Sequence, residues 1–154
     1  MSIEPETWLS LKRIVRFGDT DAAGVMHFHQ LFRWCHEAWE ESLELYGLTP
    51  QKIFPCLNSL ENKISVFLPI VHCEADFFLP IQVGDYLNVE LSPKRVNPSS
   101  FHVVFTFKRD DQEVAKGLIS HRSINSLSRE ICPLPEDIQR WLEASSLNLG
   151  VNTI

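Results

Sequence analysis

The feature that most constrains the fold is a single long helical pattern placed ahead of an unbroken series of β-patterned runs. Between residues 28 and 46, apolar side chains recur at helical spacing and most polar side chains share the remaining arc. Gly47 suits the left-handed position that ends many helices, and Pro50 follows as a stop signal. We therefore predict one helix over 28–46, covered on more than one side. Its apolar stripe comprises Phe28, Leu31, Phe32, Trp34, Cys35, Ala38, Trp39, Leu43, Leu45 and Tyr46.

Several runs with β periodicity follow the helical pattern, and no second long helical pattern separates them. The clearest is 101–108, where every odd position carries a large apolar residue. Short connections between such runs favour antiparallel pairing. We predict an α+β fold, with the long central helix wrapped by a curved antiparallel sheet of about five strands. Strands are expected at 11–17, 70–78, 85–91, 101–108 and 113–125, a strand or extended loop at 64–68, and a small packing helix at 134–143.

The bulk properties indicate one globular domain. The chain has 154 residues, of which 44% are hydrophobic and 22% charged, enough to bury a real core. Within it we expect a loose lead-in at 1–10, the main unit at 11–126, and a tail at 127–154 that belongs to the same domain. A net charge of −6 argues against nucleic-acid or anionic-membrane partners, although a local basic cluster could still bind an anionic ligand.

Cysteine usage and the N-terminal composition favour a cytoplasmic setting. The four cysteines are scattered without a C-x-x-C pair, so neither a zinc knuckle nor a redox motif is indicated. Residues 1–9 contain two glutamates and lack the apolar core of a signal peptide. No apolar run is long enough to span a bilayer, so no membrane span is expected.

The turn that precedes the long helix concentrates the candidate chemistry. It holds Asp19, Asp21 and Gly24 within six residues, just ahead of the helix N-terminus. Free N–H groups at such a terminus can bind a developing oxyanion, while a nearby carboxylate can act as base or nucleophile on the same carbon. From the residues alone, Asp21 could equally be an Asx-turn or capping residue, and Gly24 an ordinary loop glycine.

The same run resembles a known enzyme family. Residues 19–25, Asp-Thr-Asp-Ala-Ala-Gly-Val, followed by Phe28 and a long amphipathic helix, resemble the hotdog-fold acyl-CoA thioesterases of the 4-hydroxybenzoyl-CoA thioesterase type. Three further segments are similar to cyanobacterial 1,4-dihydroxy-2-naphthoyl-CoA thioesterases of phylloquinone synthesis. They are Cys-His-Glu-Ala at 35–38, Leu-Pro-Ile-Val-His at 68–72, and Asp-Phe-Phe-Leu-Pro at 76–80 with Gly-Asp at 84–85. The similarity covers roughly residues 10 to 126 and implies a hotdog fold.

The resemblance also implies roles for individual residues. Asp21 matches the family's catalytic carboxylate, whereas Asp19 matches a position with a turn-stabilising role. The oxyanion would be bound by the backbone N–H of Phe28, assisted by that of His27. Phe28 replaces a Tyr of the benzoyl enzymes, a change that removes a hydroxyl but keeps the main-chain donor. Because a carboxylate can either attack a thioester or deprotonate water, both routes stay open.

Substrate contacts are expected at two places. Gly24, Val25, His29 and His72 are predicted to contact the acyl group, where an imidazole N–H of His27 or His29 could meet a phenolic hydroxyl. His72 could instead be a strand residue that faces solvent or the dimer partner. Residues 96–100 align with a nucleotide-contacting loop of the benzoyl enzymes, and basic residues nearby could bind phosphates. The predicted coenzyme A contacts are Lys94, Arg95, Ser99 and Ser100.

Neither a metal nor another cofactor is expected. The His27-Phe28-His29 spacing does not align two imidazoles on one helical face, and no H-E-x-x-H pattern is present.

The resemblance implies hydrolysis of an aromatic acyl-CoA, most directly 1,4-dihydroxy-2-naphthoyl-CoA. One alternative is a broad short-chain or hydroxybenzoyl-type acyl-CoA thioesterase, like the Tol-Pal-associated enzymes. Another, of a different class, is a hotdog module that binds acyl-CoA without cleaving it. Because family members work as dimers or tetramers with the site at a subunit interface, a homo-oligomer, a dimer of dimers, is implied.

Overall fold

The computed structural model describes residues 4–56 and 64–146. The predicted long helix is confirmed as α2 (Phe28–Tyr46), the one long helix of these ranges. Its C-terminus ends as the sequence predicts, because Gly47 has a φ of 115° and donates to the carbonyls of Leu43 and Glu44 at 3.2 and 2.9 Å. The N–H of Leu48 closes the motif with a 2.9 Å bond to Leu43 O.

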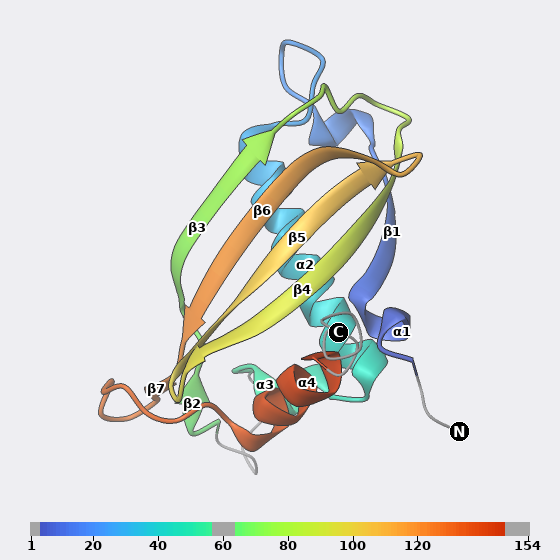
Figure 1. The fold of residues 1–154 in the computed structure, drawn as a ribbon. Helices are drawn as coiled ribbons and strands as arrows, with labels where there is room; N and C mark the ends of the chain where they lie inside the picture. The colour runs from blue at the N-terminus through green and yellow to red at the C-terminus, as the bar shows by residue number, and fades with distance from the viewer. Residues whose placement is uncertain (1–3, 57–63, 147–154) are drawn as a thin grey trace.

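A five-stranded antiparallel sheet curves over α2, which confirms the predicted α+β class (Figure 1). Its strand order is β1-β4-β5-β6-β3, so β1 and β3 form its edges. A second pair, β2 with β7, lies outside this sheet. The strands are β1 (Ser10–Ile14), β2 (Val66–Phe67), β3 (Ile70–Phe77), β4 (Tyr86–Asn97), β5 (Ser100–Arg109), β6 (Gln112–Arg122) and β7 (Ile124–Asn125). The shorter helices are α1 (Glu6–Leu9), the 3-10 turn η1 (Phe17–Asp19), α3 (Pro50–Ile53) and α4 (Glu136–Ser146).

Several element boundaries differ from the predictions. The first strand ends at Ile14, three residues early, because residues 17–19 close into η1. The predicted strand 113–125 is two strands, β6 and β7, separated at Ser123, whose N–H bonds to Ser99 O at 2.8 Å. Strand β4 extends six residues past its predicted end, because its pairing with β5 continues to Asn97.

The lead-in is also more ordered than predicted. Residues 6–9 form α1, and Trp8 is only 4% exposed. Its indole Nε1–H donates to Ser145 Oγ on α4 at 2.9 Å, so the two distant ends of the described chain pack together. A similar bond joins Trp141 Nε1–H to Ser42 Oγ on α2 at 3.1 Å.

The apolar stripe of α2 faces the core with a different centre from the predicted one. Phe28 and Leu45 are exposed, whereas the polar Ser42 is fully buried. Relative to the predicted stripe, the helix is rotated about its axis so that Cys35 packs closely against Gly117 of β6. A β-carbon at Gly117 would lie 2.8 Å from Cys35 Sγ. Only glycine leaves room for the helix to sit this deep. The buried face of α2 is Leu31, Trp34, Cys35, Ala38, Trp39, Ser42 and Leu43.

A buried imidazole completes the aromatic part of the core. His121 on β6 is 1% exposed and stacks between Trp39 and Phe101, with ring centroids 4.4 and 4.9 Å away. Its Nδ1 lies 3.1 Å from Leu68 O; since a carbonyl can only accept, Nδ1 carries the proton. Burial lowers the pKa of His121 to about 4, so the ring is neutral in the folded protein.

The neutral state of His121 predicts acid sensitivity. The unfolded chain binds this proton near the ordinary pKa of 6.5, while the folded chain does so only near 4. Stability is therefore complete above pH 6.5 and falls as the pH drops toward 4, by about 3 kcal/mol at most. His121→Asn, which keeps a donor for Leu68 O, is expected to flatten this slope in urea unfolding measured between pH 4 and 7. The exposed His72→Asn serves as the control, and an unchanged slope in His121→Asn would contradict the assignment.

Candidate active site

The turn that carries Asp21 is held by its own hydrogen bonds. Asp21 N–H donates to Val25 O at 2.8 Å, and Gly24 N–H donates to Asp21 O at 3.0 Å. Gly24 has a φ of 79°, the left-handed conformation that glycine adopts without strain. Flanking the turn, Thr20 and Met26 form an isolated antiparallel bridge. The glycine is therefore required by the turn's backbone conformation.

The Asp21 carboxylate forms an Asx turn, with Oδ1 accepting from Ala23 N–H at 2.8 Å. The prediction that Asp21 could be an Asx-turn residue is thus confirmed by this hydrogen bond. It leaves Oδ2 without a hydrogen-bond donor among residues 4–56 and 64–146. Because one oxygen is fixed by the backbone and the other is available, the Asx turn orients the carboxylate and is compatible with a chemical role.

The neighbouring carboxylate has a structural hydrogen bond of its own. Asp19 Oδ2 accepts from Arg16 N–H at 2.7 Å, across the η1 turn. This is the turn-stabilising role expected of Asp19.

The N-terminus of α2 offers one open backbone donor. His27 is the N-cap residue, and its Nδ1 accepts from His29 N–H at a long 3.4 Å. The N–H of Gln30 bonds to His27 O at 3.0 Å. Among the described residues, the N–H of Phe28 has no acceptor.

The hydrogen bonds of this turn bear on the prediction that His27 supplies a second oxyanion donor. Its backbone N–H already donates to Asp19 O at 2.9 Å. That bond joins residues eight positions apart, so no local pattern at the helix start reveals it.

An apolar groove of about 450 Å³ opens beside Asp21. Among the described residues that line it, Asp21 is the only one with an ionisable side chain, and Phe28 and Phe78 on its walls are 65% and 51% exposed. Met26 N–H donates to Ile81 O at 2.8 Å and so joins the turn to the opposite wall. The groove is lined by Asp21, Val25, Met26, Phe28, Phe77, Phe78, Leu79, Pro80 and Ile81.

The wall formed by residues 77–81 was missed as a site by sequence reasoning. The sequence shows only two adjacent phenylalanines at the end of a strand, a pattern that is equally typical of core packing. Figure 1 shows the loop after β3 and the loop before α2 at the same end of the sheet. Only the tertiary fold brings these two loops together.

The predicted acyl contacts are only partly brought together. Val25 lines the groove, Gly24 lies in the adjoining turn, and the exposed His29 ring lies 4.0 Å from that of His27. His72 lies near the other end of β3, five residues and roughly 17 Å from Phe77. There it lies 3.9 Å from Glu74 and does not reach the groove of its own chain.

The predicted coenzyme A contacts also lie far from Asp21 in one chain. Lys94 and Arg95 are near the far end of β4, eight or nine residues and more than roughly 25 Å from its start at Tyr86. Ser99 bonds to Asn97 Oδ1 through its N–H and hydroxyl, and Ser100 is buried. The structure therefore separates these residues from the groove by the length of the sheet.

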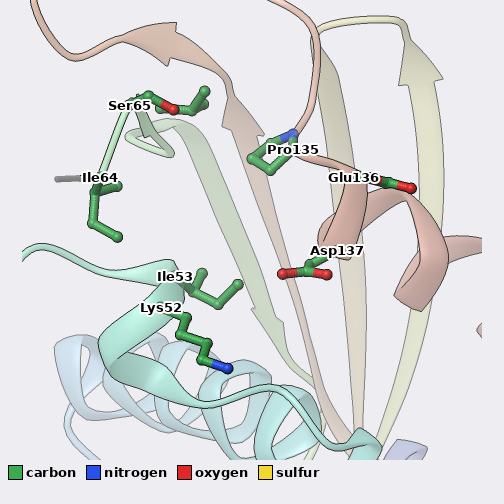
Figure 2. Close-up of a pocket in the computed structure, with 8 residues that line it drawn as sticks. Lys52, Ile53, Ile64, Ser65, Pro135, Glu136 and Asp137 are labelled. Atoms are coloured by element: carbon green, nitrogen blue, oxygen red, sulfur yellow. The ribbon is translucent and has the colours of Figure 1, made fainter. Parts of the chain in front are cut away.

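A different cavity, of about 630 Å³, lies between α3, the segment 64–66 and the start of α4 (Figure 2). Lys52 and Ile53 face Pro135 and Asp137 across it. It includes none of the predicted site residues, and its Glu136 carboxylate is paired with Arg140 at 2.6 Å. Nowhere in the described ranges do three His, Cys, Asp or Glu side chains form a group that could hold a metal ion.

Comparison with known protein families shows to which family the chain belongs. Residues 15–142 match the model of the thioesterase-like superfamily, which is most of the chain and includes both walls of the groove. The chain belongs to the thioesterase-like superfamily. A carboxylate beside a free helix N-terminal N–H, in an apolar groove, is thus found in a member of a thioester-cleaving group.

Curated relatives narrow the comparison. The chain is 64% identical over 149 residues to a 1,4-dihydroxy-2-naphthoyl-CoA hydrolase of Prochlorococcus marinus, covering 97% of this chain and 96% of that protein. It is 56% identical over 140 residues to a protein of the same name from Synechococcus sp. (strain CC9311), covering 91% and 92%.

Solved structures of this superfamily confirm the predicted hotdog fold. A protein from Prochlorococcus marinus str. MIT 9313, whose crystal structure is known, aligns with a TM-score of 0.88 at 60% identity, over 93% of this chain and 99% of that chain. A 1,4-dihydroxy-2-naphthoyl-CoA thioesterase from Synechocystis aligns with a TM-score of 0.76 at 31% identity, over 87% and 94%. No helix in the described part of the chain is long and apolar enough to cross a membrane.

Proposed function

We propose that this protein hydrolyses an aromatic acyl-CoA thioester, 1,4-dihydroxy-2-naphthoyl-CoA, to 1,4-dihydroxy-2-naphthoate and CoA in phylloquinone or menaquinone synthesis. The observation that carries the proposal is that the Asp21 carboxylate and the Phe28 N–H border the same apolar groove, and that this N–H has no acceptor among the described residues. The shared name of the cyanobacterial relatives supports this choice of acyl group. We assign the reaction to the cytoplasm, in keeping with the free thiols of Cys35, Cys73 and Cys132.

The two groups suit the two demands of thioester cleavage. The Phe28 N–H, at the positive end of the α2 dipole, would stabilise the negative charge that develops on the carbonyl oxygen. Asp21 would act in one of two ways. As a base, it takes a proton from the attacking water and returns it to the departing CoA thiolate. As a nucleophile, it forms an acyl anhydride and releases CoA, and water then cleaves the anhydride.

The groove walls suit a flat aromatic acyl group. Phe28, Phe77 and Phe78 present exposed rings beside Asp21. Burial of an aromatic acyl group against such rings would be favourable, with stacking adding about 0.5–1.5 kcal/mol per ring pair. The imidazoles of His27 and His29, which lie next to the groove at the start of α2, could contact a phenolic hydroxyl.

We further propose that the site is completed in a homo-oligomer, a dimer of dimers. Strand β3 is an unprotected sheet edge, and Ile70, Val71 and Phe77 on it are exposed. Antiparallel pairing of two β3 edges about a two-fold axis would invert the second sheet. The end of the second copy that carries Lys94, Arg95, Ser99 and Ser100 would then lie on the side of the first copy's groove. On this proposal, these residues and His72 serve the groove of the other copy.

The substrate assignment is tested by thiol release from four thioesters of CoA: dihydroxynaphthoyl, hydroxybenzoyl, hydroxyphenylacetyl and butyryl. A kcat/KM for the naphthoyl compound at least about tenfold above the others is expected, since each 1.4 kcal/mol of differential binding is worth a factor of ten. A preference for butyryl would favour the broad short-chain alternative. Tight binding without thiol release would favour the acyl-CoA-binding module.

Replacement of the carboxylate tests the role of Asp21. Asp21→Asn can still accept from Ala23 N–H, so the turn is retained, but the amide cannot act as base or nucleophile. We expect kcat to fall by about 10² or more with KM changed less than about twofold, because the lost interaction acts in the transition state. Asp19→Asn is the matched control, whose amide oxygen can still accept from Arg16 N–H and whose turnover should stay near wild type. Full turnover in Asp21→Asn would exclude the assignment.

The oligomer proposal is tested by analytical ultracentrifugation together with turnover. The wild type is expected to sediment as a dimer or tetramer. Val71→Lys adds a charge to the β3 edge and should shift the protein toward monomer with a parallel loss of turnover. Leu127→Lys, at an exposed apolar residue outside the β3 edge, should change neither property. A monomeric wild type with full turnover would contradict the proposal.

A further inference from the structure

We propose that Arg109 is a positioning residue for this reaction. It holds the groove wall formed by residues 77–81 in place relative to Asp21. The inference rests on the proposed thioester hydrolysis. Arg109 is the last residue of β5, and neither the groove lining nor the Asp21 turn includes it. Its effect on the reaction is therefore transmitted through other residues.

The guanidinium of Arg109 is bonded to the loop that forms the wall. Its Nη1 donates to Pro80 O at 2.9 Å and to Asp85 Oδ2 at 2.6 Å. The two charged side chains are only 28% and 22% exposed, so this ion pair is better shielded from solvent than the helix-surface pairs of the molecule. Partly buried, charge-assisted hydrogen bonds of this kind are stronger than neutral ones.

Asp85 extends the connection across the whole loop. Its Oδ2 also accepts from Gln82 N–H at 2.9 Å, and its carbonyl accepts from Val15 N–H at 2.9 Å, just past β1. Gly84 N–H returns a bond to Val15 O at 2.8 Å. The segment 80–85 is therefore fastened to the end of β1 and, through Arg109, to the end of β5.

One hydrogen bond carries this constraint into the catalytic turn. Ile81 O accepts from Met26 N–H at 2.8 Å, and both side chains are almost fully buried. Met26 pairs with Thr20 on one side of the Asp21 turn and lies two residues before Phe28 on the other. The position of Ile81 thus helps to fix the separation between the Asp21 carboxylate and the Phe28 N–H.

The test compares Arg109→Ala and Arg109→Lys with Lys108→Ala. Lys108 is the adjacent residue and also forms an ion pair, with Glu90 at 3.1 Å, but it has no bond to the loop. We expect Arg109→Ala to lower kcat about tenfold or more, since small misplacements of reacting groups cost one to two orders of magnitude. Lysine keeps the charge and several donors, so Arg109→Lys should recover part of the rate, while Lys108→Ala should match wild type.

A readout independent of the folded fraction separates positioning from general destabilisation. Partial unfolding lowers kcat for every substrate equally, whereas a displaced wall alters the ratio of kcat/KM between dihydroxynaphthoyl-CoA and hydroxybenzoyl-CoA. We expect this ratio to change at least about threefold in Arg109→Ala and to return toward wild type when guanidinium is added at millimolar concentration. An unchanged kcat, or a lower kcat with an unchanged ratio and no guanidinium rescue, would overturn the proposal.

A second variant covers the case in which Arg109→Ala does not fold. Asp85→Asn keeps the acceptor for Gln82 N–H but removes the charge that holds Arg109. We expect the same change in the substrate ratio, and the double variant Arg109→Lys/Asp85→Asn should be no worse than the more affected single variant. An unchanged ratio in Asp85→Asn would also overturn the proposal. Failure of the proposed function looks different, because the wild type itself would then release no thiol from any thioester.

Discussion

The depth at which α2 sits in the sheet is the constraint on which the rest of the structure depends. That depth is set where Cys35 packs against Gly117, because any β-carbon at position 117 would come within 2.8 Å of the thiol sulfur. The same contact fixes the rotation of the helix and so decides which of its residues are buried. Burial raises the pKa of the Cys35 thiol, which stays protonated and acts as a small apolar group. The helix N-terminus, and with it the Phe28 N–H, is placed as a consequence.

Around that N-terminus, most polar groups already have partners. One oxygen of Asp19, the N–H of His27 and one oxygen of Asp21 are all bonded within the turn. The acceptor at Asp21 Oδ2 and the donor at Phe28 N–H remain, on the border of an otherwise apolar groove. Both residues are exposed, so water can bond to these two groups until a ligand takes its place. A thioester carbonyl together with an attacking oxygen would satisfy both.

Sequence periodicity was sufficient for the elements but not for their tertiary contacts. The helix at 28–46 and the strand at 101–108 were predictable because their apolar spacing is nearly ideal. The face that α2 buries was not, because it depends on a glycine 82 positions after Cys35. The role of Asp21 could be proposed from its motif. The engaged N–H of His27 and the wall at 77–81 could not, because both depend on contacts made only after the chain folds.

The two indole-to-serine hydrogen bonds involve tryptophans, whose fluorescence depends on their surroundings. All four tryptophans of the chain are at least 95% buried, on α1, α2 and α4. Trp8 and Trp141 report the junction of the chain's ends with α2 and α4, whereas Trp39 reports the aromatic stack beside His121. Tryptophan fluorescence therefore reports loosening both where α1 and α4 pack together and in the centre of the core. Both regions lie outside the described lining of the Asp21 groove, so a change in their emission reports the packing of the core and of the helix junction.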